Sequence, residues 1–459
     1  GSSKFPTDQQ WAFFPSVSGG WRVSEEAFWK VNPDLFSNLK IRVSYGSLGN
    51  GNVSPYSFLE LLSISTSGRV LNGLKNKYTS APAVMPDGLT WETATTTDVG
   101  LDFGMLNNRL QFNGDYYIRK TTDMYTVGET LPDVFGASSP KGNYADMTTK
   151  GWEITLTWRD QFTLAEKPFN YEIRGTLSDY ISTIDRYNNQ TGNLDDYYAG
   201  KRVGEIWGYV TEGLFKDQAD IDSHADQTLI QSSSKRITYP GDVKIKDLNG
   251  DHVIDYGNNT VDDHGDKTVI GNALPRYAYS INLSGDWNNF FLSAFFQGVG
   301  KQDWYPSSEC IFWGQYNRPY NNMPTWHQGN YWTEDNTDAY LPRYAGYNAS
   351  LKSTPQTRYL QNVAYIRLKN LQFGYTLPQP IVSKAKLQNV RVYISAENLW
   401  CWSPLYKHTR DLDVTNIYGS DPDLTDADMS SGLNGNRGSG DGNSYPQMKS
   451  VSLGLSVTF

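Results

Sequence analysis

The acidic stretch over residues 247–266 contains residue types that bind a hard divalent cation. Its ligand-type residues stand at positions 1, 3, 5 and 9 of an EF-hand-type loop: Asp247, Asn249, Asp251 and Asp255. His252 stands at position 6, where such a loop requires Gly for its sharp turn, and Asn258 stands at position 12, where it requires Glu. The pattern predicts either a Ca²⁺ site or a polar turn, because Asp and Asn also tolerate left-handed backbone.

A second group with binding chemistry is aromatic and lies over residues 304–332. Aromatic faces stack on sugar rings, and Trp and Tyr are favoured where two proteins anchor to each other. The candidates for substrate or partner contact are Trp304, Trp313, Tyr316, Trp326 and Trp332. Trp313 and Trp326 are the expected partner anchors; the alternative is that the rings hold a long loop together. Asp421 and Asp423 are two further candidates for partner contact, unless they only shape a turn.

Enzyme signatures are missing from the sequence, which has no HExxH, no GxSxG and no P-loop. The five histidines fall in predicted loops without metal-ligand spacing. Cys310 and Cys401 form no CxxC motif and are either free thiols or one disulfide between two loops. The net charge of −9 argues against nucleic acid as a partner. The chain is therefore not expected to be an enzyme.

Apolar and polar residues alternate with a period of two along the chain, which indicates β-strands. At the C-terminus, apolar side chains point to one face and Ser, Thr and Gly to the other: Val451, Leu453, Leu455, Val457 and Phe459. The same alternation recurs in YAYSINLSGDW, GWEITLTWRD, VRVYISAEN, LKIRVSYGS, RLQFNGDYY and NYEIRGTLSDY. The polar faces are poor in charge for a soluble sandwich, and aromatics lie toward the strand ends, as at a membrane interface.

About eleven strands are expected, and the links between them alternate in length. The short or moderate links are near 24–38, 105–109, 160–169, 286–289 and 377–389, and the long ones are near 47–90, 125–147, 186–273, 299–362 and 399–446. Outer-membrane barrels alternate short periplasmic turns with long extracellular loops. The fold class predicted is therefore all-β, an antiparallel transmembrane β-barrel with long extracellular loops. Val451, Leu453, Leu455 and Val457 are expected to face lipid.

Ten blocks occur along the chain in a characteristic order: FFPSVSGGWRVSEEAF, LKIRVSYGSLGN, WETATTTDVGLDFGM, KGWEITLTW, GDVKIKDLNGDHVID, VIGNALPRYAYSINL, YIRLKNLQFGYTLP, VRVYISAENLW, SDPD and SVSLGLSVTF. Together they resemble the β-barrel of SusC/RagA-type TonB-dependent transporters, which are outer-membrane importers of Bacteroidetes-like bacteria. The resemblance implies that residues 1–459 are the C-terminal half of a 22-strand barrel. The plug and the other N-terminal domains of the family are absent from this chain.

The same resemblance implies a function and partners. A plugged barrel of this kind imports a bulky nutrient, energised by TonB through the missing N-terminal region, and a SusD-like surface lipoprotein covers its mouth. A glycan is favoured over an oligopeptide because of the aromatic-rich loops. The second interpretation is a surface carbohydrate-binding β-sandwich without transport.

The resemblance also bears on the acidic loop. The family commonly carries DLNGDG-ID followed by an acidic residue and TVIG, and DKTVIG at 266–271 matches that ending. The implied Ca²⁺ ligands are Asp247, Asn249, Asp251, the Val253 carbonyl, Asp255 and Asp266, with Asp262 or Asp263 as alternative closing ligands. His252 and the inserted YGNNTVDDHG depart from the family pattern. The ion would be structural, pinning a long loop before the lipoprotein docks.

Overall fold

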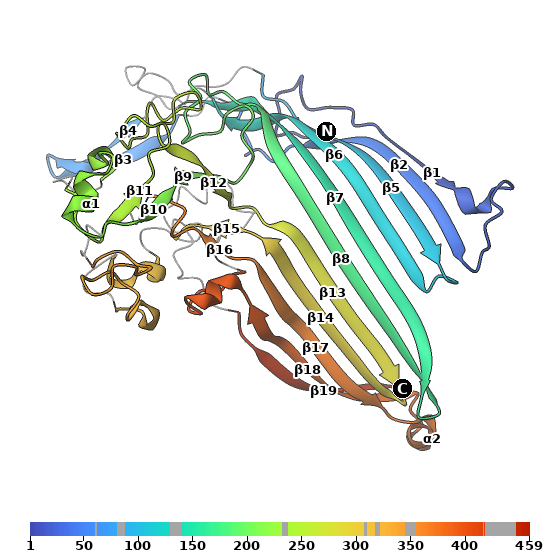
Figure 1. Ribbon diagram of the computed structural model, residues 1–459. Coiled ribbons are helices and arrows are strands. Elements are labelled where there is room, and N and C mark those ends of the chain that lie inside the picture. The colour runs from blue at the N-terminus through green and yellow to red at the C-terminus, as the bar shows by residue number, and fades with distance from the viewer. Residues whose placement is uncertain are drawn as a thin grey trace.

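Eleven strands form one antiparallel sheet, capped at one end by a layer of long loops (Figure 1). The computed structural model describes residues 1–59, 62–79, 88–128, 139–231, 237–306, 310–316, 322–344, 354–415, 417 and 447–459. The strands of the sheet are β1 (Ser16–Arg22), β2 (Phe36–Asn50), β5 (Glu92–Met105), β6 (Leu110–Val127), β7 (Lys141–Leu164), β8 (Lys167–Arg186), β13 (Arg276–Trp287), β14 (Phe290–Lys301), β17 (Tyr365–Thr376), β18 (Asn389–Trp402) and β19 (Ser450–Thr458). They lie side by side in this order, which confirms the predicted antiparallel sheet.

Smaller elements lie mostly in the long connections. The minor strands pair as β3 (Ile64–Leu71) with β4 (Leu74–Thr79), β9 (Glu205–Tyr209) with β12 (Lys267–Asn272), β10 (Thr211–Leu214) with β11 (Val243–Ile245), and β15 (Asp303–Trp304) with β16 (Gln361–Asn362). The helical segments are η1 (Val23–Glu25), α1 (Gln218–Asp222), η3 (Thr228–Ile230), η4 (Ile311–Tyr316), η5 (Thr325–His327), α2 (Gln379–Val382), η7 (Ser383–Ala385) and η8 (Pro404–Lys407). Among the described residues, no helix has the length and apolar character needed to cross a membrane.

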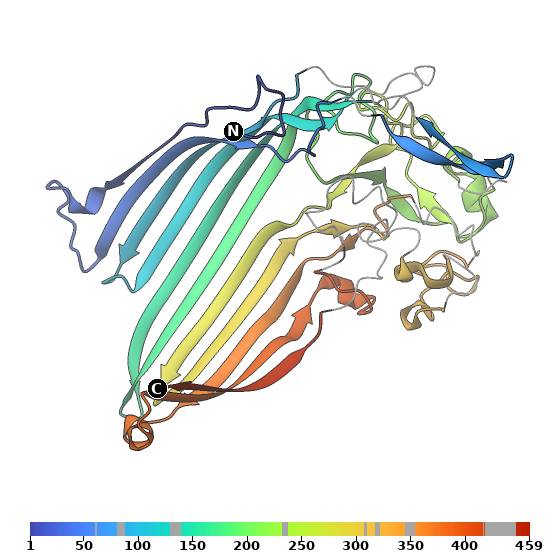
Figure 2. The same ribbon diagram turned by 180° about the vertical axis from the view of Figure 1, so that it is seen from behind.

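The two ends of the sheet differ in the length of their connections. At one end, β7 joins β8 through Ala165 and Glu166, and β13 joins β14 through Asn288 and Asn289. All four residues have φ between 46° and 68°, as a two-residue type I′ hairpin requires. The connections at the other end run over 51–91, 128–140, 187–275, 302–364 and 403–449. Figure 2 shows this loop layer from behind, and the predicted alternation of short and long links is confirmed.

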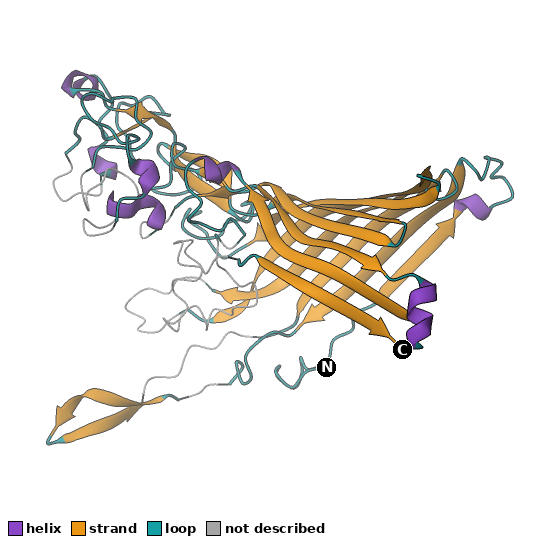
Figure 3. Cartoon of the chain, turned by 90° about the horizontal axis from the view of Figure 1, so that it is seen from below, coloured by secondary structure: helices purple, strands orange, loops and turns teal. Residues whose placement is uncertain are grey.

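One face of the sheet is apolar and exposed across its whole width. Residues directly opposite in an antiparallel pair point to the same face. The ladder therefore places apolar neighbours in a row: Leu453, Ile394, Phe373 and Leu292 on β19, β18, β17 and β14. Each of these four side chains is about half or more exposed, Leu453 at 78%. Within the described residues, no second sheet covers this face (Figure 3).

The exposure of this apolar face distinguishes the membrane barrel from the β-sandwich, the two folds that the sequence allows. Val451, Leu453 and Leu455 are exposed and Val457 partly so, as expected for side chains that face lipid. A β-sandwich needs an opposing sheet about 10 Å away to bury this face. The other sheets of the described chain are two-stranded, and they lie among the loops beyond the end of the large sheet (Figure 3). The sandwich interpretation is therefore wrong for this sheet.

Aromatic side chains bound the apolar band along a strand. On β13, Trp287 and Tyr279 both lie on the apolar face, eight residues apart. At a rise of about 3.3 Å per residue they are about 26 Å apart along the strand, which a tilt of 35–45° reduces to a height of roughly 20 Å. Trp287 lies opposite Phe290 and Phe169 in the ladder. This spacing fits two aromatic girdles on either side of a hydrocarbon layer.

The opposite, concave face is polar and held together by ion pairs. Arg42 on β2 forms two hydrogen bonds of 2.9 Å to the Asp102 carboxylate on β5, and its Nη1 lies 2.8 Å from Asp115 Oδ1 on β6. Gly100 lies between Arg42 and Asp115 in the ladder. A Cβ at Gly100 would lie 2.4 Å from the Asp115 carboxylate and 2.6 Å from Arg42 Cζ, so only glycine leaves room for this pair.

The two faces predict opposite responses to the same charge. In a lipid bilayer, Leu453→Arg is expected to destabilise the sheet by roughly 2–4 kcal/mol, because it places a cation in hydrocarbon near the middle of β19. The matched control is Ser452→Arg, whose side chain points to the polar face beside Ser395. Folding in lipid vesicles, followed by the heat-modifiable band on a gel, measures both. Equal losses for the two variants would contradict the assignment of the faces.

Candidate functional site

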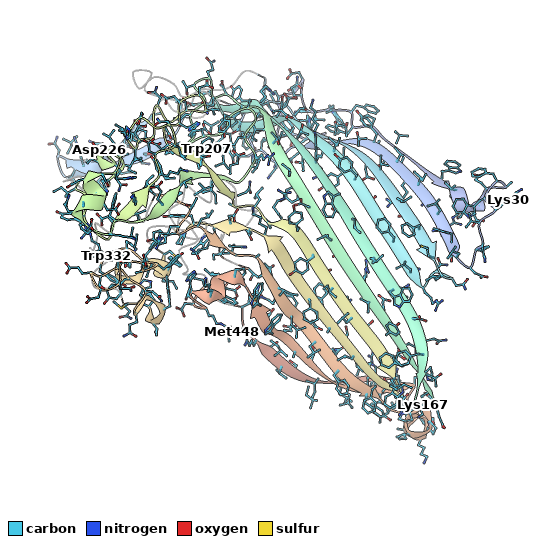
Figure 4. The ribbon with its side chains drawn as sticks, viewed as in Figure 1. Lys30, Lys167, Trp207, Asp226, Trp332 and Met448 are labelled. Carbon is cyan, nitrogen blue, oxygen red and sulfur yellow. The ribbon has the colours of Figure 1, made fainter. Side chains whose placement is uncertain are left out.

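The loop layer has a hydrophobic core of its own, here called the loop core. Its buried members are Tyr209, Leu214, Val243, Ile245, Ile254, Trp304, Cys310, Phe312, Trp313, Tyr316, Leu341, Tyr359, Val363, Tyr365, Leu405, Leu412, Val414 and Ile417. Nearly all of these residues belong to three long connections, which follow β8, β14 and β18. Figure 4 shows Trp332, which packs against this core, within the loop layer, far from Lys167 at the short turns. The three connections therefore form one packed body at the open end of the sheet.

Three of the aromatic candidates lie inside the loop core. Trp304, Trp313 and Tyr316 have at most 1% of their surface exposed. Trp313 donates from Nε1 to the Pro306 carbonyl (3.2 Å), and the Tyr316 hydroxyl donates to the Pro342 carbonyl (2.5 Å). A ring enclosed on all sides offers no face to a ligand in this conformation. The expectation of direct contact by these three residues is corrected: they hold the loops together, as the alternative proposed.

Of the remaining candidates, the two tryptophans lie among the described residues and the two aspartates do not. Trp326 and Trp332 are half-buried against the loop core. The Trp326 ring lies 4.9 Å from the Phe312 ring and 4.3 Å from the His327 ring. Contact of Trp326 or Trp332 with a substrate or partner stays a prediction. Asp421 and Asp423 lie outside the described residues. Cys310 and Cys401 are not joined in a disulfide.

His327, which the sequence analysis assigns only to a predicted loop, is a buried polar side chain. Its side chain is fully enclosed, with Nε2 2.9 Å from the Phe312 carbonyl and Nδ1 2.6 Å from the Tyr344 hydroxyl. A carbonyl only accepts, so Nε2 carries the proton, and the neutral ring accepts from Tyr344 at Nδ1. Burial lowers the pKa of His327 to about 4, against a smaller opposing effect of the Phe312 carbonyl. His327 is thus a neutral crosslink inside the loop core.

A buried ion pair fastens the last long connection to the sheet. Arg367 on β17 donates from Nη2 to Asp413 Oδ1 (2.6 Å), and both side chains are at most 7% exposed. Asp413 also accepts from the Thr415 hydroxyl (2.7 Å) and from the Thr415 and Gln447 backbone N–H groups. Burial alone would raise the pKa of Asp413, but these hydrogen bonds and the Arg367 charge outweigh it and lower the pKa. Nothing in the sequence pairs two residues 46 positions apart, so only the structure reveals this contact.

The acidic loop is ordered by hydrogen bonds from its own backbone. The Asp247 carboxylate accepts from the Gly250 and His252 N–H groups at 2.6 and 2.9 Å. Asn249 and Asp251 accept from the N–H groups two residues further along. His252 adopts a φ of 66°. This residue therefore takes the left-handed conformation for which such a loop favours glycine, at some cost in strain.

Asp266 closes the loop from inside. Its side chain has no exposed surface, and its two oxygens accept from the Leu248 N–H (2.7 Å) and the Asp255 N–H (3.0 Å). Both oxygens of the residue predicted to close the loop therefore accept hydrogen bonds from backbone N–H groups. Among the described residues, no three His, Cys, Asp or Glu side chains converge as a metal ligand set would. Binding of Ca²⁺ at this loop stays a prediction, whose direct test is loss of loop order on chelation.

The inserted residues 256–265 fasten the acidic loop to a neighbouring segment. Thr260 forms a bridge with Asn193, and the Val261 N–H donates to the Gly192 carbonyl (2.9 Å). The Asn259 side-chain amide donates to the Asp195 carboxylate at 2.8 Å. The insertion, which the sequence shows only as a departure from the family pattern, thus has a structural purpose. It joins two parts of the long connection between β8 and β13.

Comparison with known proteins identifies the family to which this chain is similar. Residues 1–399 match the family model described as TonB dependent receptor-like, beta-barrel. The chain is 28% identical over 481 residues to the TonB-dependent receptor P26 of Formosa agariphila, and 24% identical over 475 residues to the TonB-dependent receptor SusC of Bacteroides thetaiotaomicron. Each alignment covers 100% of this chain, with 43% and 41% of those proteins.

A solved structure shares the fold. The RagAB peptide importer in the open-open state aligns with a TM-score of 0.70 and 19% identity, over 100% of this chain and 44% of that chain. The chain therefore spans less than half the length of these relatives. At this identity the structural likeness concerns the fold.

The first prediction from the loop layer concerns Asp266. Asp266→Ala leaves the Leu248 and Asp255 N–H groups without their acceptor, which destabilises the loop because both donors are only partly accessible to water. We expect faster amide hydrogen exchange across 247–266. Asp262→Ala, at an exposed position of the same loop, is the matched control and leaves exchange unchanged. Unchanged exchange in the Asp266 variant would show that other contacts order the loop.

The second concerns pH. Between pH 6.5 and pH 4 an unfolded loop binds a proton at His327 and the folded loop does not, so the stability of the loop core is complete above this window and falls as pH falls through it. Urea titrations followed by tryptophan fluorescence should show this fall. His327→Gln, which keeps a donor for the Phe312 carbonyl, should flatten it, whereas His252→Gln in the exposed acidic loop should not. An equal slope in wild type and His327→Gln would contradict the assignment.

Proposed function

Because the chain belongs to the β-barrel family of TonB-dependent receptors, we propose that it is the C-terminal part of the wall of an outer-membrane nutrient importer. The observation that carries the proposal is the two-sided sheet: apolar and exposed outside, polar inside, with long loops at one end only. An exposed apolar face of this width suits lipid, and the polar concave face suits a hydrated solute.

The two edges of the sheet support a larger barrel. Within the described residues no ladder joins β1 to β19. Unpaired backbone groups in hydrocarbon cost several kcal/mol each, so an open sheet does not persist in a bilayer. Strands from outside this sequence would close the barrel, and its lumen would be wide enough to hold a plug. The relatives, more than twice as long as this chain, leave room for both.

The partners we propose are a surface lipoprotein of the SusD type and TonB. The packed loop layer offers the lipoprotein a firm surface over the barrel mouth, with the half-buried Trp326 and Trp332 as its candidate contacts. TonB would act through segments that precede the barrel in the family. RagAB is described as a peptide importer, and that description concerns RagAB itself.

For the substrate we propose a bulky oligomer, with a glycan ahead of an oligopeptide. Its support is the aromatic content of the loops, although the burial of Trp304, Trp313 and Tyr316 removes these three rings from direct contact. The half-buried rings of Trp326 and Trp332 keep partial exposure for stacking on a sugar. Growth on oligosaccharides and on oligopeptides distinguishes the two substrate classes.

Growth of the host organism tests the proposal. Deleting the gene should abolish growth on one oligomeric nutrient while growth on its monomer continues, and loss of TonB should reproduce the defect. Oligosaccharides and oligopeptides are tested side by side, and the wild-type gene restores growth in the control strain. Uptake of all oligomers at the wild-type rate in the deletion strain would refute import by this protein.

A further inference from the structure

The connection between β2 and β5 carries a hairpin that stands apart from the rest of the described chain. Among the described strands, β3 and β4 pair only with each other, through Leu71 opposite Leu74 and a turn at Asn72 and Gly73 with φ of 52° and 77°. Figure 3 shows the hairpin away from the sheet and from the other loops. An isolated two-stranded hairpin is marginally stable in water, so such an element gains stability when a surface covers it.

The hairpin combines apolar and basic side chains. Its large apolar residues are 53–70% exposed: Ile64, Val70, Leu71, Leu74 and Tyr78. Arg69, Lys75 and Lys77 lie among them, and residues 61–86 contain no Asp or Glu. The hairpin thus carries a charge of +3, while the remainder of the chain, at −9 minus 3, carries −12. Among the described residues, none of these three cations has a salt-bridge partner, and the surface that fits them is acidic with an apolar centre.

The position of the hairpin favours a protein over a membrane as its occupant. Figures 1 and 2 place β3 and β4 with the loop layer, level with α1 and far from the short turns. Lipid headgroups would meet the sheet below this layer, where the apolar band ends. A basic, apolar element at this height meets whatever covers the mouth of the barrel.

We propose that the β3–β4 hairpin is a docking element for the surface lipoprotein, bound through an acidic patch with an apolar centre on that partner. The proposal rests on the proposed function, which supplies the lipoprotein. Opposite charges would steer the encounter, and burial of the facing Leu71 and Leu74 side chains would hold the complex. The partner would thus cover a hairpin whose strands pair only with each other.

Co-purification of the lipoprotein with the tagged, full-length transporter tests the hairpin. The triple variant Arg69→Glu, Lys75→Glu, Lys77→Glu should lower the recovered lipoprotein tenfold or more at low salt, and Leu71→Ser with Leu74→Ser should lower it similarly. The matched control is the double variant Lys384→Glu, Lys386→Glu. Both lysines lie in or directly after η7, at the opposite end of the sheet, so the recovery of lipoprotein should not change. The heat-modifiable band confirms that each barrel has folded.

A photo-crosslinking amino acid at Leu74 gives an independent measurement that needs no loss of binding. Adducts with the lipoprotein support the proposal, whereas adducts only with lipid or with the transporter's own loops overturn it. Full recovery of lipoprotein with both hairpin variants also overturns it and leaves the proposed function intact. If no lipoprotein accompanies the wild-type transporter, the partner assignment in the proposed function fails first.

Discussion

Backbone hydrogen bonding is the constraint on which this structure depends. A strand in hydrocarbon has no water to satisfy its N–H and C=O groups, so each must pair with a neighbouring strand. From β1 to β19 the sheet meets this demand between its members, because each strand forms a ladder with the next, and only the outer edges of β1 and β19 are left to pair with other strands. The register of these ladders then decides which side chains share a face. The apolar band, the polar lumen face and the position of every loop follow from that register.

The lumen face shows how the sheet accommodates charge. Arg42 reaches across β5 to Asp115 because Gly100 lies between them in the ladder. The guanidinium therefore contacts carboxylates on two strands, and three neighbouring strands share one ion-pair cluster. Such partly exposed pairs contribute modestly to stability, but they keep the charges paired and the wall polar. An aqueous passage is compatible with such a wall.

The loop layer solves a different problem. Connections of this length would lose much conformational entropy on ordering, unless they bury enough apolar surface to offset it. Here aromatic side chains supply that surface, and buried polar groups such as His327 and Arg367 find partners inside it. The acidic loop and its insertion are ordered in another way, by hydrogen bonds that backbone N–H groups donate within the loop and to the neighbouring segment. The long loops at the open end of the sheet thus form one packed layer, whereas the β3–β4 hairpin is not part of their core.

The sequence by itself determined the sheet. Alternation in stretches such as 450–459 fixes the period and the face of each residue, and the lengths of the links distinguish the two ends, because both are local properties. What only the tertiary structure decided lies in the loops. Whether Trp313 is enclosed or exposed, and whether Asp266 binds backbone or solvent, depends on segments distant in sequence. An aromatic or acidic residue has the same appearance in a sequence whether it packs a loop or meets a ligand, since only burial and the direction of hydrogen bonds separate the two.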